Sequence, residues 1–88
     1  MKEKELEKIL KALANRRRLE IVKYIKQKKE ASVGNIAEHI KLSFKSTSRH
    51  LAVLAGADLV EKEQRNVSVF YSLAPKLVSL AKLVISEI

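Results

Sequence analysis

Residues 42–56 read LSFKSTSRHLAVLAG, a run with the signals of a short helix that has a defined start and a defined end. Ser43 is the predicted N-cap, because its hydroxyl can accept a hydrogen bond from a free backbone N–H of the first turn. Gly56 is the predicted terminator, because glycine readily takes the left-handed conformation that closes a helix. The side chains predicted to face a core recur at three- and four-residue spacing: Phe44, Thr47, Leu51 and Leu54.

The other side of this predicted helix is cationic and rich in hydroxyl groups, with Lys45, Ser46, Arg49 and His50. Residues 40–57 contain no Asp or Glu, although the chain has ten of them. A face of this kind suits binding to a polyanion that also presents hydrogen-bonding groups for side chains to recognise. A merely solvated face is the plainer interpretation, but serine and threonine are mediocre helix formers and a solvated helix more often uses Glu, Gln, Lys or Ala.

A second short helix is predicted directly before this one. Ser32 should cap a helix over residues 33–40, and residues 41–42 leave only a tight link between the two helices. Two short helices joined by so brief a turn, the second with an uncluttered cationic face, are the pattern of a helix-turn-helix.

Two further helices are predicted upstream, over residues 4–13 and from Arg16 to residue 25, with Asn15 as the N-cap of the second. Residues 26–31 are predicted to be a polar connection. Three arginines at positions 16–18 oppose the positive end of the helix dipole, so a compensating anion is expected. An acidic neighbour is favoured for Arg18, whereas an acidic neighbour and a phosphate are equally supported for Arg16 and Arg17.

After Gly56 the apolar period changes from 3.6 residues to two, which predicts strands over residues 59–63 and 67–73. Residues 64–66 are the predicted three-residue turn of the hairpin. Asn66 is the residue best able to take a left-handed conformation there, and Arg65 should project from the tip.

A final helix is predicted to begin at Pro75, which suits a first helical turn. It is apolar on almost three sides, with Val78, Leu83 and Ile85 widening its stripe. So much apolar surface on a small protein needs a cover, so we expect a homodimer built from this helix and the first one. The predicted interface residues are Leu6, Ile9, Leu10, Leu13, Leu77, Leu80, Ala81, Val84 and Ile88.

Chain length, net charge and composition limit the possible functions. The 88 residues are expected to form one domain over residues 1–88, and the formal charge of +8 favours an anionic partner, nucleic acid first. The chain has no cysteine, no apolar run that could span a bilayer and no signal-peptide pattern, so a cytoplasmic protein with no membrane association is expected. The chain has no Gly-rich phosphate loop and no clustered acid/base set, so an enzyme is not expected.

Four helices, a hairpin and a last helix make a mainly α fold with a β-hairpin wing, the winged helix-turn-helix. The chain resembles the ArsR/SmtB family of bacterial and archaeal transcriptional repressors along almost its whole length. The shared sequence motifs include LKALAN at residues 10–15, SRHL at 48–51 with Leu54 three residues later, and FYSL at 70–73.

The resemblance implies a homodimeric repressor on a double-stranded DNA operator, with the helix that begins after Ser43 in the major groove and the hairpin on the flanking backbone. By that resemblance the expected DNA-binding residues are Ser43, Phe44, Lys45, Ser46, Ser48, Arg49 and His50 on the helix and Lys62 and Arg65 on the wing. Of these, Lys45, Ser46 and Arg49 should read base edges. A module that binds a protein or RNA partner remains the alternative.

The chain departs from the family at its sensor positions. Family members that sense metals use a Cys-x-Cys motif on the helix corresponding to residues 33–40, or Asp and His ligands on the last helix, and neither is present. His39 and His50 are interpreted as surface or phosphate-contacting side chains, so no metal or other cofactor is expected, and whether an inducer exists is open. Phe44 stands where a polar residue is commoner, and it could pack at the core edge or touch a thymine methyl. The wing tip also lacks the usual glycine.

Overall fold

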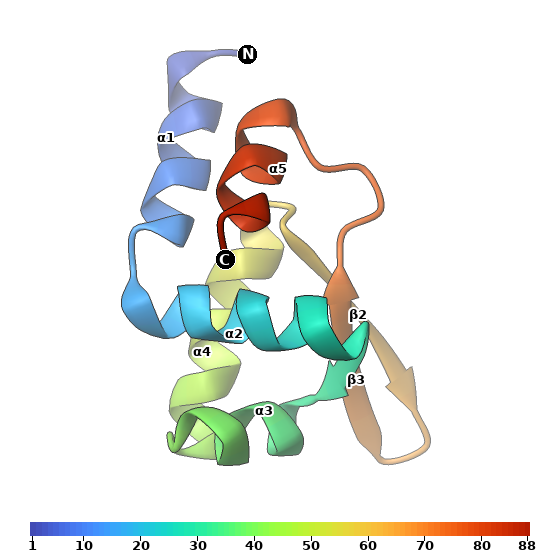
Figure 1. The fold of residues 1–88 in the computed structure, drawn as a ribbon. Coiled ribbons are helices and arrows are strands. Elements are labelled where there is room, and N and C mark those ends of the chain that lie inside the picture. The colour runs from blue at the N-terminus through green and yellow to red at the C-terminus, as the bar shows by residue number, and fades with distance from the viewer.

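The computed structural model describes residues 1–88 and contains five helices and a three-stranded antiparallel sheet (Figure 1). The predicted order of four helices, a hairpin and a final helix is confirmed, with one strand added. The elements are α1 (Glu3–Leu13), α2 (Arg16–Lys28), β1 (Glu30–Ser32), α3 (Val33–Ile40), α4 (Phe44–Gly56), β2 (Val60–Arg65), β3 (Ser68–Leu73) and α5 (Ser79–Ser86).

Three helices begin at the side-chain caps that the sequence predicts. The Asn15 side chain accepts a hydrogen bond from the Arg18 N–H at 3.0 Å. The Ser32 hydroxyl accepts from the Asn35 N–H at 3.1 Å, and the Ser43 hydroxyl accepts from the Ser46 N–H at 3.1 Å. Each cap satisfies a backbone donor that has no partner inside its own helix.

The predicted polar connection over residues 26–31 is wrong. Helix α2 continues to Lys28, and Lys29 then takes a left-handed φ of 74° that turns the chain into β1. This strand pairs with β3, with Glu30 opposite Ser72 and Ser32 opposite Phe70. Three residues are too few for a two-residue alternation to appear in the sequence, so only the pairing with β3 defines this strand.

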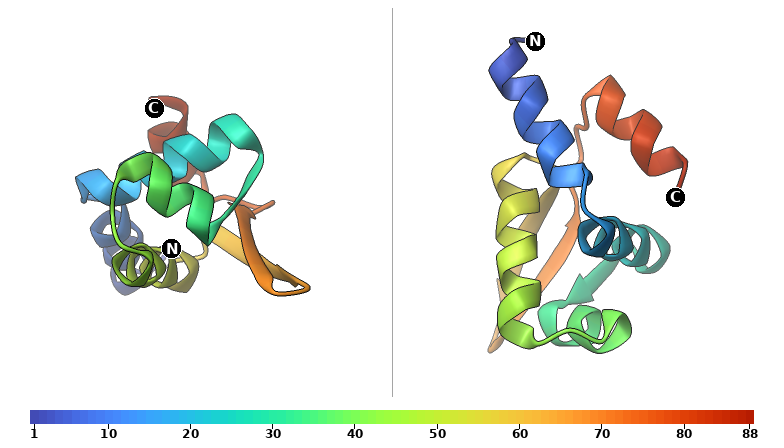
Figure 2. Two further views of the ribbon diagram at one scale, coloured as in Figure 1. Left: turned by 90° about the horizontal axis from the view of Figure 1, so that it is seen from below. Right: turned by 90° about the vertical axis from the view of Figure 1, so that its left-hand side faces the viewer.

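The sheet order is β1-β3-β2, and β2 and β3 form the hairpin that extends from the body of the molecule (Figure 2). Arg65 pairs with Ser68, so the loop consists of Asn66 and Val67 alone, and the predicted three-residue turn is wrong. The left-handed conformation predicted for Asn66 is confirmed by its φ of 56°. A positive φ at the first of two loop residues is the φ pattern of a type II′ turn, which matches the strand twist.

Two predicted helix boundaries are corrected. Gly56 ends α4 without a positive φ, and Asp58 instead takes the left-handed conformation with a φ of 57°. Helix α5 begins at Ser79, not at Pro75. Residues 74–78 form a non-helical connection that carries the chain from the sheet to the level of α1 (Figure 1).

One cluster of 18 buried residues, drawn from all five helices and the sheet, forms the core. On α4 the predicted inward positions Thr47, Leu51 and Leu54 are fully buried. Phe44 is 62% exposed, so its predicted place on the core stripe is wrong. Helical side chains lean towards the N-terminus, so a side chain in the first turn points past the end of the helix and away from the core beneath it.

Candidate nucleic-acid interface

Helix α4 presents a cationic surface at its N-terminal half. Lys45 and Arg49 lie about one turn apart, both exposed, and neither forms an ion pair or a side-chain hydrogen bond in the structure. Ser43 is exposed at the cap, and Ser46 and Ser48 are partly buried beside the two cations. Because Thr47, Leu51 and Leu54 hold the opposite side of α4 in the core, this face is fixed towards solvent.

The turn between α3 and α4 is fixed by the backbone and by Arg17. Lys41 takes a left-handed φ of 57°, and the Leu42 N–H donates to the Ala37 carbonyl at 3.0 Å. The Arg17 guanidinium donates to the Ile40 carbonyl at 2.6 Å and to the Glu20 carboxylate at 3.2 Å. A cation is favourable at the C-terminal end of a helix, so Arg17 closes α3 and holds the start of α4 in place.

Arg18 links α1 to α4. Its guanidinium donates to the carbonyl oxygens of Ala12 at 2.6 Å and Lys11 at 3.0 Å, and its Nη1 lies 3.2 Å from Nδ1 of His50. The predicted acidic neighbour of Arg18 is therefore wrong, because the partners are carbonyl groups at the end of α1. The packing of α1 against α2 brings these carbonyl groups to Arg18, and that packing cannot be predicted from the local sequence.

The contact with Arg18 sets the tautomer of His50. A guanidinium has donors only, so Nδ1 of His50 must accept, and the proton of the neutral ring lies on Nε2. Burial, together with the nearby charges of Arg18 and Arg17, lowers the pKa of His50 below its ordinary value. The lowered pKa favours the neutral ring, whose Nε2–H is then available as a donor.

Arg65 does not project from the wing tip, contrary to the sequence prediction. It donates to the two carboxylate oxygens of Glu30 at 2.5 and 2.8 Å and to Glu63 at 2.9 Å, and its guanidinium lies 4.8 Å from the centre of the Phe70 ring. The hydrogen bonds from Arg65 lower the pKa of Glu30. Glu30 belongs to β1, a three-residue strand defined only by its pairing with β3, so this ion pair could not be predicted from the sequence.

Lys62 is the other predicted wing residue. It is exposed, lies opposite Tyr71 in the pairing of β2 with β3, and has no carboxylate partner. Since successive strand residues alternate between faces, Lys62 and Arg65 lie on opposite faces of β2. The wing therefore carries one unpaired cation on the face away from the glutamates.

The predicted dimer surface is divided between the core and the exterior. Ile9, Leu13 and Ala81 are buried in the core of the single chain, beneath the surface that the prediction assigns to the dimer. Leu6, Leu10 and Leu83 are 36%, 46% and 62% exposed. The remaining predicted interface residues are partly buried: Leu77, Leu80, Val84 and Ile88.

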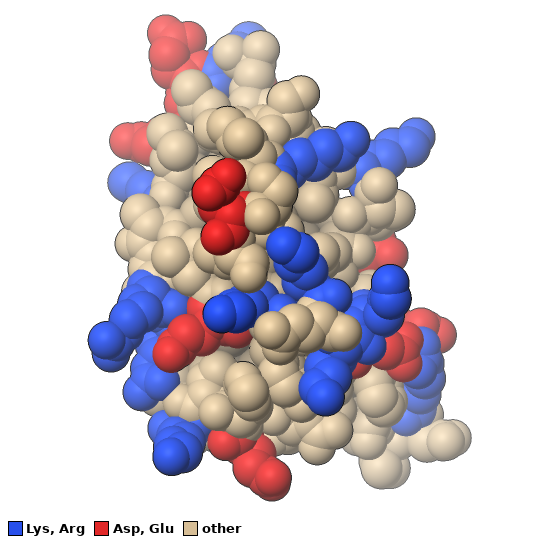
Figure 3. Space-filling model, viewed as in Figure 1, with Lys and Arg blue, Asp and Glu red and all other residues tan.

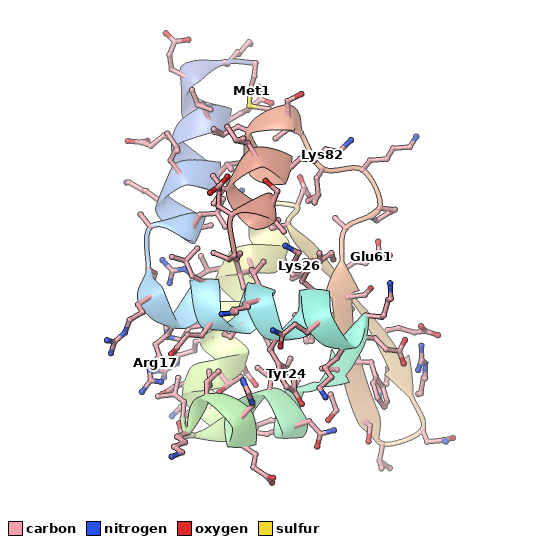
Figure 4. The ribbon with its side chains drawn as sticks, in the orientation of Figure 1. Met1, Arg17, Tyr24, Lys26, Glu61 and Lys82 are labelled. Atoms are coloured by element: carbon pink, nitrogen blue, oxygen red, sulfur yellow. The ribbon has the colours of Figure 1, made fainter.

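Helices α1 and α5 occupy the same end of the molecule, opposite the start of α4 and the wing tip (Figures 1 and 2). Lys26 of α2 points towards α5 and donates to the Ile85 carbonyl at 2.9 Å, which anchors the end of that helix (Figure 4). In the view of Figure 3, lysines and arginines gather at the level of α2, whereas acidic and basic side chains are interspersed with uncharged surface over α1 and α5.

The two histidines lie apart, on α3 and α4. His39 stacks on Tyr24 of α2, with 4.2 Å between ring centres, and His50 contacts Arg18. The structure contains no group of three or more His, Cys, Asp or Glu side chains placed to hold a metal ion. None of its helices has the length and apolar character required to span a membrane.

The two short helices with a tight turn, followed by a hairpin, define a winged helix-turn-helix protein. A family model described as "Bacterial regulatory protein, arsR family" matches residues 15–62. That is more than half of the chain, and the chain belongs to this family.

Relatives agree with this assignment. The transcriptional activator HlyU of Vibrio cholerae is 39% identical over 66 residues, which are 75% of this chain and 60% of that protein. The chain thus matches less than two thirds of that relative's length. A solved structure of HlyU from V. cholerae has a TM-score of 0.81 at 32% identity, over 99% of this chain and 92% of that one.

A second solved structure is that of a homodimeric winged helix-turn-helix DNA-binding domain from Mycobacterium bovis, a possible ArsR-family regulator. It has a TM-score of 0.82 at 26% identity, over 96% of this chain and 74% of that one.

Proposed function

We propose that this protein is a homodimeric, sequence-specific transcriptional regulator that binds double-stranded DNA and represses by occupying an operator. The observation that carries the proposal is the face of α4, where Lys45 and Arg49 are exposed and unpaired on a helix without acidic residues. Membership of the arsR family supports it, as do the relatives that are themselves transcriptional regulators. A protein that occupies operators works where the DNA is, so we place it in the cytoplasm and assign it no catalytic role.

The contacts are divided by chemistry. Arg49 can grip a guanine through two hydrogen bonds, and Lys45 and Ser46 can reach neighbouring base edges. Ser43, Ser48 and the Nε2–H of His50 supply donors for phosphates or bases, which fix the register of the helix. Phe44 is the remaining residue of α4 that we assign to the DNA contact.

On the wing, Lys62 is the cation free to meet the flanking backbone. Arg65 would first have to leave Glu30 and Glu63, so its predicted contact with DNA is secondary to that of Lys62. A phosphate contact of this kind adds affinity for every sequence alike.

The homodimer rests on the exposed leucines of α1 and α5, Leu6, Leu10 and Leu83. A symmetric dimer reads two half-sites whose centres are about 34–36 Å apart, one turn of DNA. One copy measures 37 × 23 × 21 Å, a scale at which two copies joined through these helices can span that distance. The homodimeric M. bovis domain, with the same fold, supports this arrangement.

The test begins with a duplex enriched from a random pool by binding to the protein, compared with a scrambled duplex of the same composition. We expect tighter binding to the enriched duplex, and Arg49→Ala should lose about 1–3 kcal/mol on that duplex and relax the preference at one base pair. Lys82→Ala removes the same charge from α5, far from the start of α4 (Figure 4), and should leave the preference intact. Equal binding to both duplexes would refute the proposed function.

A further inference from the structure

Phe44 is an exposed aromatic side chain at the N-terminal end of α4, next in sequence to Lys45 of the cationic face. It is 62% exposed, more than any other aromatic residue of the chain, and it is the first residue of the helix. The Ser43 cap fixes the backbone at this point, with the Ser43 hydroxyl 3.1 Å from the Ser46 N–H. The ring is therefore presented from a rigid position.

The neighbours of Phe44 determine what can cover it. Lys41 and Lys45 flank it in sequence, both are exposed, and no acidic residue lies between positions 39 and 57. An apolar partner brought to this ring must tolerate a dense positive surface around it. Duplex DNA meets this requirement, because its major groove lies between two phosphate backbones.

The major groove contains one apolar group, the C5 methyl of thymine, and a phenyl ring is among the side chains that contact it. Removing this methyl and part of the ring from water is favourable in proportion to the apolar area that is covered. At the first position of α4, Phe44 enters the groove with Lys45 and Ser46, and it cannot form the hydrogen bonds that read the other base edges.

We propose that Phe44 contacts the C5 methyl of a thymine and sets a preference for a T·A pair at one position of each half-site. This inference rests on the proposed function, because it requires α4 to lie in the major groove. Phe44 is then a specificity-determining residue, distinct from Arg49, whose contact is polar.

The test replaces single thymines of the enriched duplex by deoxyuridine, which removes only the methyl group. We expect one position per half-site at which the substitution weakens wild-type binding about fourfold, the effect of burying one methyl-sized group. Phe44→Ala should bind the thymine and uracil duplexes equally, and Phe44→Leu should retain part of the difference. Val67→Ala, which trims the 96% exposed apolar side chain at the wing tip, should keep the wild-type preference.

Two results would overturn the inference while leaving the proposed function standing. One is wild-type binding that is insensitive to uracil at every thymine of the enriched duplex. The other is a Phe44→Ala protein that keeps the full thymine preference but changes its oligomeric state in a sizing column, which would assign Phe44 to a protein contact. A failure to enrich any duplex would refute the proposed function itself.

Discussion

At the scale of single residues, Arg18 and His50 form the contact with the clearest consequence. One guanidinium closes the end of α1 and meets a histidine of the proposed DNA-reading helix at 3.2 Å. Protonation of His50 would place two cations side by side and remove the acceptor that Arg18 uses. The two helices are therefore joined by a bond that requires neutral histidine.

Stability should depend on pH through this residue. The pKa of His50 is lowered in the folded protein from its ordinary 6.5, first by burial and then by Arg18, so the unfolded chain binds a proton at this residue more readily than the folded chain does. The contribution of His50 to the free energy of unfolding should be constant above the ordinary pKa of about 6.5. It should fall as the pH drops below 6.5 and level off once the pH is below the lowered pKa of the folded protein. Urea unfolding between pH 5 and 8 measures this.

His50→Asn provides the comparison, because an amide oxygen can accept from Arg18 and does not titrate. This variant should show a weaker loss of stability below pH 6.5 than the wild type. An identical pH profile for the two proteins would remove His50 as the cause. The contribution of Glu30 to the free energy of unfolding is lost only at lower pH. Arg65 lowers the pKa of this carboxyl below its ordinary 4.5, so the loss begins as the pH falls below about that value.

Some residue contacts could be predicted from the sequence and others could not. The caps at Asn15, Ser32 and Ser43 join residues three apart, so they are visible in the sequence. Arg18 and Arg65 bond to groups brought near by tertiary packing, with Glu30 lying 35 residues from Arg65. Charge patterning indicated that the arginines needed partners, and only the fold identifies them.

At the scale of elements, α4 depends on its start. The Ser43 hydroxyl satisfies a backbone N–H of the first turn, and the same turn presents Phe44, Lys45 and Ser46. The cap therefore contributes to both stability and the proposed DNA contact, and two substitutions can separate those contributions.

Ser43→Ala should lower the free energy of unfolding by about 1 kcal/mol, because the cap is lost. Ser43→Asp retains an acceptor and should preserve stability, since a carboxylate is favourable at a helix N-terminus. The same carboxylate would face phosphates, so Ser43→Asp should weaken binding to the enriched duplex more than Ser43→Ala does. Urea unfolding and duplex titration of both variants test this, and stronger DNA binding by the aspartate variant would contradict the assigned position of Ser43.

Element order was predictable, whereas element ends depended on packing. Periodicity separated helix from strand for every long segment, but β1 has only three residues and is defined by its pairing with β3. The start of α5 was misplaced because Pro75 suits a helix, yet residues 74–78 must travel from the sheet to α1. Phe44 followed the helical spacing of the core stripe but lies one turn beyond the core.

At the scale of the whole molecule, the two proposed surfaces occupy opposite ends. The exposed leucines of α1 and α5 lie at one end, and the start of α4 and the wing tip lie at the other (Figure 1). Periodicity identified the apolar faces of the first and last helices, but it does not reveal whether the same chain or a partner covers each residue. Ile9, Leu13 and Ala81, for example, belong to the predicted interface and are buried in the core of the single chain.

Leu83→Glu should disrupt the proposed dimer without unfolding the chain, because this side chain is 62% exposed in a single copy. Covering an unpaired carboxylate in an apolar interface costs more than about 1.4 kcal/mol, so the dimer dissociation constant should rise at least about tenfold. Analytical ultracentrifugation measures the change, and circular dichroism confirms folding. Val67→Glu, a change of the same charge at the wing tip, should leave the dimer intact, and equal dissociation constants for both variants would place the interface elsewhere.

The central claim is that two symmetry-related α4 helices lie in successive major grooves. Guanine N7 faces the major groove, so its protection from methylation on the enriched duplex reports where each α4 helix lies. We predict two protected clusters, related by two-fold symmetry, with centres about 10–10.5 base pairs apart and on one face of the duplex. A single cluster, or no protection of guanine N7 anywhere on the enriched duplex, would contradict the account.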